Sequence, residues 1–156
     1  MQGDADIIGM LNEVLTGELT AVNQYFLHSK LCANWGYRRL AEHAHDESIG
    51  EMKDADAIIE RILLLDGHPN LQRLGTVSAG ETVPEQFDAD AALERAAIER
   101  LRAGIEQAYS ASDHGTRELL EHILVGEESH LDWIETQQRV IAEIGEAHYL
   151  AQQLHA

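Results

Sequence analysis

Apolar residues recur along the chain at alternating intervals of three and four, which is the spacing of one face of an α-helix. The first such run extends from about residue 4 to 34, and Gly36 stands where a left-handed residue would end a helix. A second run extends from about residue 37 to 66 and stops before Gly67 and Pro69. The pattern therefore predicts two long helices at the start of the chain.

Residues 67–81 separate the second run from the third and show no helical period, and they include Gly67, Pro69, Gly75 and Gly80. A helix of about 30 residues is about 45 Å long, and about 15 extended residues reach about 50 Å. This connection can thus cross the full length of a bundle. We expect it to make the second and third helices parallel.

The third run begins at Thr82 and continues to about residue 111. Thr82 is placed to cap a helix, and Glu85, three residues later, completes the capping-box pattern. The tripeptide 113–115, Asp-His-Gly, is expected to interrupt the helical pattern before the next run.

A fourth run extends from about residue 116 to 144 and stops at Gly145, which leaves residues 146–154 for a short fifth helix. Four long helices with one long crossover are the topology of ferritin-like proteins. We therefore predict an all-α fold: one domain over residues 1–156, forming a four-helix bundle with a crossover between helices two and three and a short C-terminal fifth helix.

The composition supports an all-α protein and limits its partners. The 156 residues include only 2 Pro, and 11 basic residues face 28 acidic ones for a net charge of −17. Nucleic acids and anionic membranes bind basic surfaces, so neither is an expected partner, and cations are favoured. Part of this charge is expected to be solvated helix surface.

The sequence also indicates a compartment. The first residues are acidic and lack the basic region and apolar run of a signal peptide, and no apolar stretch approaches the ~18 residues of a membrane span. The single cysteine, Cys32, cannot form an internal disulfide and is expected to be a semi-buried packing residue. We expect a cytoplasmic protein.

An acidic residue interrupts the apolar stripe in the middle of each predicted long helix: Glu18, Glu51, Glu94 and Glu127. Burying an unpaired charge is costly, and the basic residues lie mostly off these stripes. In a bundle the four stripes converge. A pair of metal ions is therefore the compensating charge that we expect.

The residues around these acids resemble a known ligand pattern. Ferritin-like di-iron proteins use one Glu from each of two helices and a Glu-x-x-His motif from each of the other two. The fourth helix has the motif as Glu127 and His130, whereas the second has Glu51 followed by Asp54. Carboxylates with imidazole suit iron or manganese, and zinc is an expected competitor.

Four segments carry a more specific resemblance, because they are similar to bacterioferritins over essentially the whole chain. These are LTAVNQYFLH at 19–28, ESIGEMK at 47–53, ERILLLDGHPN at 60–70 and EESHLDW at 127–133. The resemblance implies an iron-storing shell of 24 subunits. Each subunit would act as a ferroxidase, oxidising two Fe²⁺ with dioxygen or peroxide and passing Fe³⁺ to an interior mineral, which a reducing ferredoxin would help to release.

The resemblance also implies a role for each site residue. Glu18 and Glu94 would be terminal ligands, Glu51 and Glu127 would bridge the two irons, and His130 would be a terminal nitrogen ligand. Tyr25 and Trp133 match aromatic positions that supply electrons. Haem b would bind between two subunits through Met52, which lies about 100° round the helix from Glu51 and so points away from the bundle interior.

Two departures from the family pattern stand out. The first is Asp54, which replaces the histidine of the Glu-x-x-His motif on the second helix. The aspartate still offers an oxygen ligand, but its side chain is shorter than that of histidine. As a fifth carboxylate in the site, it favours Fe³⁺ over Fe²⁺. Asp46 and Gly50 occupy positions where some relatives have a His and an acid for an extra iron site on the inner wall. That extra site is not expected here.

Three functional hypotheses follow. The first is an active ferroxidase and iron store with a modified site. The second is a haem-binding shell subunit with little activity that co-assembles with a fully liganded bacterioferritin subunit. The third, a di-iron oxygenase without storage, leaves the fifth helix and Met52 without a role. Eight histidines have no partner recognisable from spacing, and most are expected on the surface: His28, His43, His45, His68, His114, His122, His148 and His155.

Overall fold

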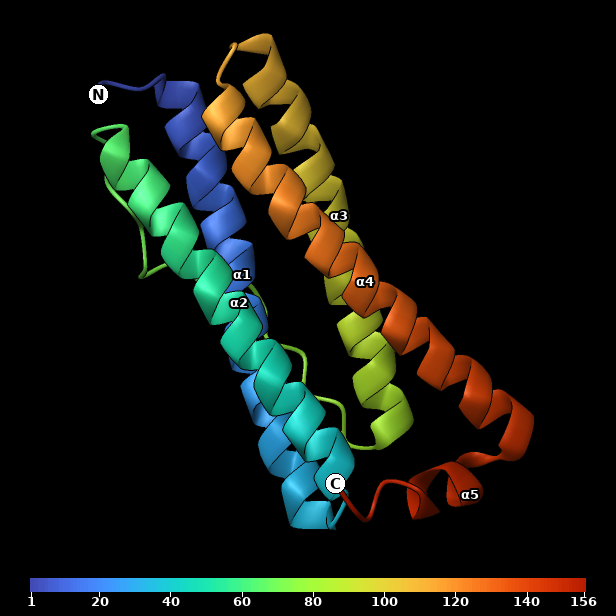
Figure 1. Cartoon of the computed structure of the whole chain (residues 1–156). Helices are drawn as coiled ribbons and strands as arrows, with labels where there is room; N and C mark the ends of the chain where they lie inside the picture. Colours follow the sequence, from blue (N-terminus) through green and yellow to red (C-terminus); the bar gives the residue numbers. More distant parts are fainter.

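The computed structural model describes all 156 residues and contains five helices and no strands. They are α1 (Ala5–Trp35), α2 (Arg38–Leu64), α3 (Val83–Ser110), α4 (His114–Ile144) and α5 (Glu146–Ala151). The first two long helices form one antiparallel hairpin and the next two form another, and α5 lies at the end of α4 (Figure 1). The predicted all-α bundle with a short fifth helix is confirmed.

The connection between α2 and α3 runs back along α1, so that α2 and α3 point in the same direction (Figure 1). The backbone N–H groups of residues 70, 75 and 80 donate to side chains at 12, 20 and 28, respectively. The acceptor side chains are eight residues apart on α1, a distance of about 12 Å along the helix, and the donor N–H groups are five residues apart in the crossover. Five residues of extended chain easily span that distance. The crossover is therefore attached to α1 at regular intervals.

The observed helix ends correct some details of the prediction. Gly36 closes α1 with a φ of 91°, as expected for a left-handed cap. Thr82 Oγ1 accepts from the N–H of Glu85 at 3.3 Å, but the Glu85 carboxylate accepts from the N–H of Glu81 instead of Thr82. Only half of the predicted capping box forms.

The predicted break at residues 113–115 is also shorter than expected. The Asp113 carboxylate accepts from the N–H and the hydroxyl of Thr116, and it pairs with Arg61 at 2.7 Å. This cap starts α4 at His114, two residues before the predicted start, because Asp is a strong N-cap and a Gly in the first turn is tolerated. At the other end, α5 stops at Ala151 instead of residue 154.

The apolar core is divided into two clusters. One lies around the start of α1 and includes Ile7, Leu11, Leu15, Ile58, Ile62, Leu101 and Leu120. The other lies near the end of α1 and includes Cys32, Leu40, Phe87, Ala91, Ile134 and Tyr149. Both clusters are supplied by several helices, and the mid-helix acids lie on the same stripes between them. The core thus provides an apolar wall on each side of the acidic positions.

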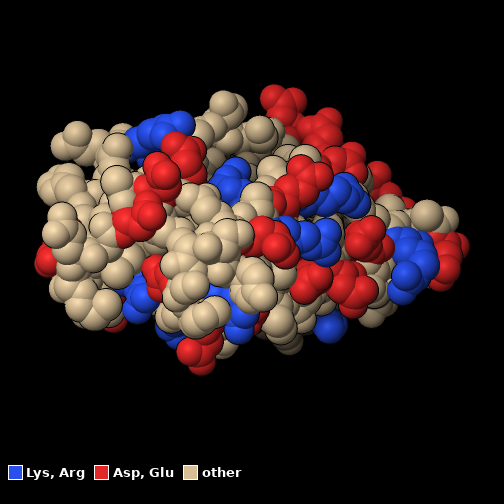
Figure 2. All heavy atoms as spheres, turned by 90° about the horizontal axis from the view of Figure 1, so that it is seen from above, with Lys and Arg blue, Asp and Glu red and all other residues tan.

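Acidic and basic side chains are interspersed over the face shown in Figure 2. Exposed ion pairs also link α3 to α4, such as Arg95 with Glu135 and Arg102 with Glu128. Exposed pairs of this kind contribute little to stability, typically about 0–1 kcal/mol. Separately, none of the helices has both the length and the apolar character that crossing a membrane requires.

Candidate metal centre

The acid in the middle of each long helix is buried. The exposed fraction is 3% for Glu18, 4% for Glu51, 1% for Glu94 and 4% for Glu127, and it is 7% for His130. Glutamate is almost never this buried without a partner. The structure therefore brings together, inside the bundle, the residues that the sequence singled out on four different helices.

These residues form two adjoining groups of possible metal ligands. In the first, ligand atoms of Glu18, Glu51, Asp54 and Glu127 lie within 4.8 Å of one another, and in the second those of Glu51, Glu94 and His130 do so. Glu51 belongs to both groups. The arrangement offers two neighbouring cation positions, of which the first has only oxygen donors and the second includes an imidazole.

Within the second group, Glu94 contacts both an imidazole and a phenol. The Tyr25 hydroxyl donates to Glu94 Oε1, and His130 Nδ1 lies 3.0 Å from the same oxygen. The rings of Tyr25 and His130 meet edge to face with their centroids 5.1 Å apart. One carboxylate thus fixes both the imidazole and the phenol.

Three buried carboxylate oxygens in the centre have no hydrogen-bond partner: Oε2 of Glu18, of Glu51 and of Glu94. A buried acceptor without a partner is costly, and a buried charge without one is more so. Arg100 acts on Glu18 only from a distance. A pair of divalent cations would satisfy these oxygens and compensate their charge, so the donor set fits a dinuclear metal site.

The pKa values of these groups reflect their burial and the short distances between their carboxyl groups. Burial raises the pKa of Asp54 to about 6, of Glu18 to about 7 and of Glu127 to about 12. Burial and the contact with Glu18 raise the pKa of Glu51 well above its usual range. Burial acts in the same direction on Glu94, but its hydrogen bonds with Glu127, His130 and Tyr25 hold its pKa below the usual range.

These shifts predict that the metal-free protein loses stability as pH rises. A carboxyl group whose pKa is higher in the folded state keeps its proton where the unfolded chain has lost it. Folding therefore becomes less favourable as the pH rises from the ordinary glutamate pKa of 4.5 to the folded-state pKa of about 7 for Glu18. We expect thermal unfolding in the presence of a chelator to occur at lower temperature at pH 7 than at pH 5. Added Co²⁺ should reverse the loss.

The variant Glu18→Gln removes one of the titrating groups and should make this pH dependence shallower. Glu99→Gln removes an exposed carboxyl on α3 and is the matched control. Equal slopes for the two variants would show that the general acidity of the chain, and not the centre, causes the pH dependence.

The predicted residues outside these two groups lie as follows. Met52 is 52% exposed, so its side chain is on the outside of α2. Trp133 is half-buried and stacks on His43, with ring centroids 3.5 Å apart. Cys32 is more deeply buried than expected, and its thiol donates to Gln86. Asp46 and Gly50 are exposed on α2.

Six of the eight unassigned histidines are exposed, as predicted, but His28 is not. His28 is 1% exposed, its Nδ1 lies 2.9 Å from Asp90, and its Nε2 accepts from the N–H of Gly80. Both partners are distant in sequence, so spacing alone could not identify them. The available signal was that His28 continues the stripe of Tyr25 by three residues.

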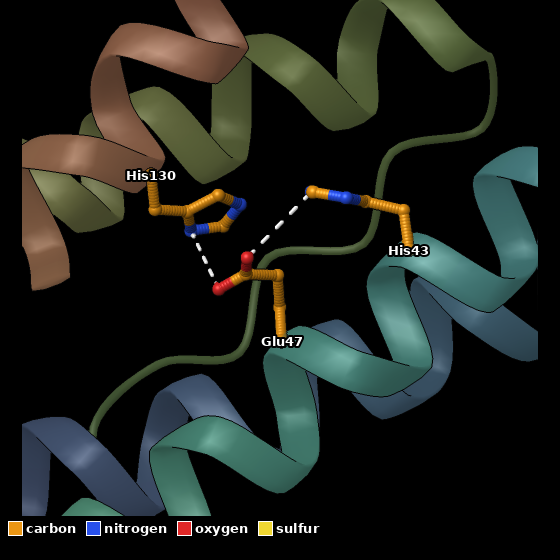
Figure 3. Close-up of side chains that lie close together, drawn as sticks. All are labelled: His43, Glu47 and His130. Carbon is orange, nitrogen blue, oxygen red and sulfur yellow. Dashed lines mark ion pairs between the residues drawn. The ribbon is translucent and has the colours of Figure 1, made fainter.

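His43 is the second exception, because it is half-buried and belongs to a third group of possible ligands together with Glu47 and His130 (Figure 3). Its ring nitrogen Nε2 is buried and has no hydrogen-bond partner. Glu47 shares the stripe of Glu51, and His43 precedes Glu47 by four residues. This spacing was visible in the sequence, but it did not show that His130 would lie across from the pair.

Comparison with known proteins agrees with this geometry. The model of the ferritin-like domain family matches residues 8–144. The chain is 51% identical over 152 residues to a bacterioferritin of Mycobacterium leprae, with 97% of this chain and 96% of that protein covered. It is 49% identical to a bacterioferritin of Streptomyces coelicolor, covering 97% and 90%, and 40% identical to one of Brucella melitensis, covering 96% and 92%. The chain therefore belongs to the ferritin-like family and, within it, to the bacterioferritins.

Proposed function

We propose that this protein stores iron and that it oxidises Fe²⁺ at the paired ligand groups before Fe³⁺ is deposited as a mineral. The observation that carries the proposal is the cluster of four buried glutamates, half-buried Asp54 and buried His130, in which three oxygens have no partner within the protein. Such a cluster binds cations strongly, and its oxygen-rich donor set suits iron. The bacterioferritin relatives support the same function.

Each residue has a role in this proposal. Glu51 belongs to both groups, and both Glu94 and Glu51 influence the pKa of Glu127, which supports the proposal that Glu51 and Glu127 bridge the pair of ions. Glu18 and Asp54 would complete the all-oxygen position, and Glu94 and His130 the other. Each Fe²⁺ gives up one electron, and two electrons with two protons reduce one dioxygen to hydrogen peroxide. The Tyr25 phenol, whose hydroxyl donates to Glu94, is the proposed donor of one electron and one proton when this hydrogen peroxide is reduced further.

The direct test is ferrous oxidation by the purified protein without any other subunit. We expect rapid formation of ferric absorbance that saturates at about two irons per subunit, followed by slower mineral growth. No oxidation above the rate in buffer would instead support a haem-binding shell subunit that needs a fully liganded bacterioferritin partner. Asp54 motivates this second candidate, because it takes the place of a histidine ligand.

The proposal extends to assembly and location. A shell of 24 subunits would enclose the mineral, and the near-complete coverage of the bacterioferritin relatives supports such an assembly. The protein would act in the cytoplasm, where a reducing ferredoxin is the proposed electron donor for iron release. Neither nucleic acid nor a membrane has a part in this function.

Haem b is the proposed second cofactor, held between two subunits by Met52 from each. The side chain is 52% exposed and follows Glu51 directly, so its thioether faces outward while Glu51 faces the centre. We expect Met52→Leu to lose nearly all bound haem, measured by the Soret absorbance per subunit. Met10→Leu, which changes a methionine packed against the core, is the control and should keep its haem. Equal haem content in both variants would show that Met52 is not the ligand.

A further inference from the structure

We propose that His43, Glu47 and His130 form a separate cation position, from which a divalent metal ion passes into the dinuclear centre. This inference rests on the proposed function in one respect: the dinuclear centre must take up the metal ion that this position passes to it. None of the bridging carboxylates belongs to this group. His43 and Glu47 belong to neither ligand group of the centre, so the proposal gives them a role of their own.

The three side chains converge from two helices. His43 and Glu47 come from α2 and His130 from α4, and the carboxylate of Glu47 lies between the two imidazole rings (Figure 3). Glu47 Oε2 is 3.4 Å from His130 Nδ1, and Glu47 Oε1 is 3.8 Å from His43 Nε2. The ligand atoms lie within 4.8 Å of one another. A single ion between them could contact all three.

His43 is held ready for a ligand that the protein itself does not supply. Its Nε2 is buried and makes no hydrogen bond, since the distance to Glu47 is too long for one. The indole of Trp133 stacks on the ring at an interplanar angle of 15° and restricts its orientation. Two imidazoles and one carboxylate are good ligands for Fe²⁺, Co²⁺ and Zn²⁺.

The space beside these side chains suits one ion. All three line a cavity of about 20 Å³ that Tyr25 and Trp133 also border. A volume of this size holds about one water molecule. A bare divalent cation is smaller than water, so the cavity has room for one.

His130 connects this position to the centre. Its Nδ1 lies 3.0 Å from Glu94 Oε1 and 3.4 Å from Glu47 Oε2, and one nitrogen lone pair binds one ion at a time. An ion held by His43 and Glu47 can thus be transferred to Glu94 by exchanging carboxylates while it stays on His130. The side chains of His43 and Glu47 are 28% and 30% exposed, against 1% for Glu94, so the position lies nearer to solvent and precedes the centre.

The variant Glu94→Ala tests the position directly, because it frees His130 from its inner partner. We expect crystals of this variant soaked in Co²⁺ to show anomalous density between His43 and Glu47. The double variant Glu94→Ala with His43→Ala should bind one Co²⁺ fewer per subunit. Glu94→Ala with His45→Ala is the control and should bind as many as Glu94→Ala, since His45 is exposed on α2.

Transfer is tested in the otherwise unchanged protein by following the d–d absorbance of Co²⁺ after mixing. His43→Ala should slow the loading of the centre about 10-fold with the same final content, which is the order expected when a supporting ligand is lost. His45→Ala should load at the original rate. Unchanged loading in His43→Ala, or Glu94→Ala crystals without density at His43, would overturn the proposal. Since Co²⁺ binding requires no oxidation, these results are independent of whether the protein oxidises iron.

Discussion

Replacing Glu94 by alanine should slow ferrous oxidation at least about 100-fold. Loss of a residue that supports a metal ligand typically lowers metal affinity or activity by about 10- to 100-fold, and Glu94 is expected to lie at the upper end of this range. Glu94 is 1% exposed, and it holds both the Tyr25 hydroxyl and His130 Nδ1 through one oxygen. Its loss would therefore remove a carboxylate ligand and release the imidazole and the phenol together. The measurement is the initial rate of ferric absorbance at two Fe²⁺ per subunit in air.

The control for this variant is Glu99→Ala, which removes a carboxylate of the same helix that is exposed to solvent. It should oxidise iron at the original rate, and both variants should keep the helical circular dichroism and the assembled mass of the parent. If Glu94→Ala retained the parent rate, oxidation would take place elsewhere, and the buried cluster would have only a storage or structural role.

The fold was predictable because its main features depend on local periodicity and on lengths. The crossover is the clearest example: about 15 residues without a helical period are long enough to run back along a helix, and its attachment points at Asn12, Thr20 and His28 show that it does so. The helix ends were less predictable. The Asp113 side chain accepts a hydrogen bond from the first turn of α4 and so caps the helix. This cap stabilises the helix start more than Gly115, which suggested a break, destabilises it.

The centre was predictable to the extent that each acid lay on an apolar stripe. Glu18, Glu51, Glu94 and Glu127 needed only the convergence of four stripes, which any bundle provides. The position at His43 was not predictable in the same way. Its third member, His130, lies on another helix, and the distance between them depends on how closely α2 and α4 approach at that level.

The two positions of the centre are unequal in the structure. Asp54 lies in the group with only oxygen donors, whereas His130 lies in the group with Glu94. Glu94 is the member of the cluster whose hydrogen bonds hold its pKa below the usual range, and burial raises the pKa of Asp54 to about 6. At neutral pH Glu94 is ionised, whereas Glu127 in the all-oxygen group keeps its proton. Glu94 also raises the pKa of His130, so a metal ion must displace a proton there, but the ionised Glu94 favours this position and we expect it to fill first.

Replacing Asp54 by histidine should make the two positions more alike, because it restores a Glu-x-x-His motif on α2. The imidazole reaches farther from the backbone than the aspartate carboxylate and adds a nitrogen donor to the all-oxygen group. It also removes one of the five carboxylates of the centre, the half-buried one, which lowers the cost of folding without metal. We expect higher occupancy of that position in Co²⁺-soaked crystals and ferrous oxidation faster by up to about 10-fold, the low end of the range for metal-site changes.

Asp56→His makes the same chemical change two residues along α2 at an exposed position, so it controls for the added histidine and the lost charge. It should leave both rate and occupancy unchanged. The comparison separates two explanations of Asp54. If Asp54→His increases occupancy and rate while Asp56→His does not, the aspartate limits metal binding at its position. If both variants behave like the parent, Asp54 supplies an adequate oxygen ligand, and the chain is an ordinary ferroxidase subunit despite the missing histidine.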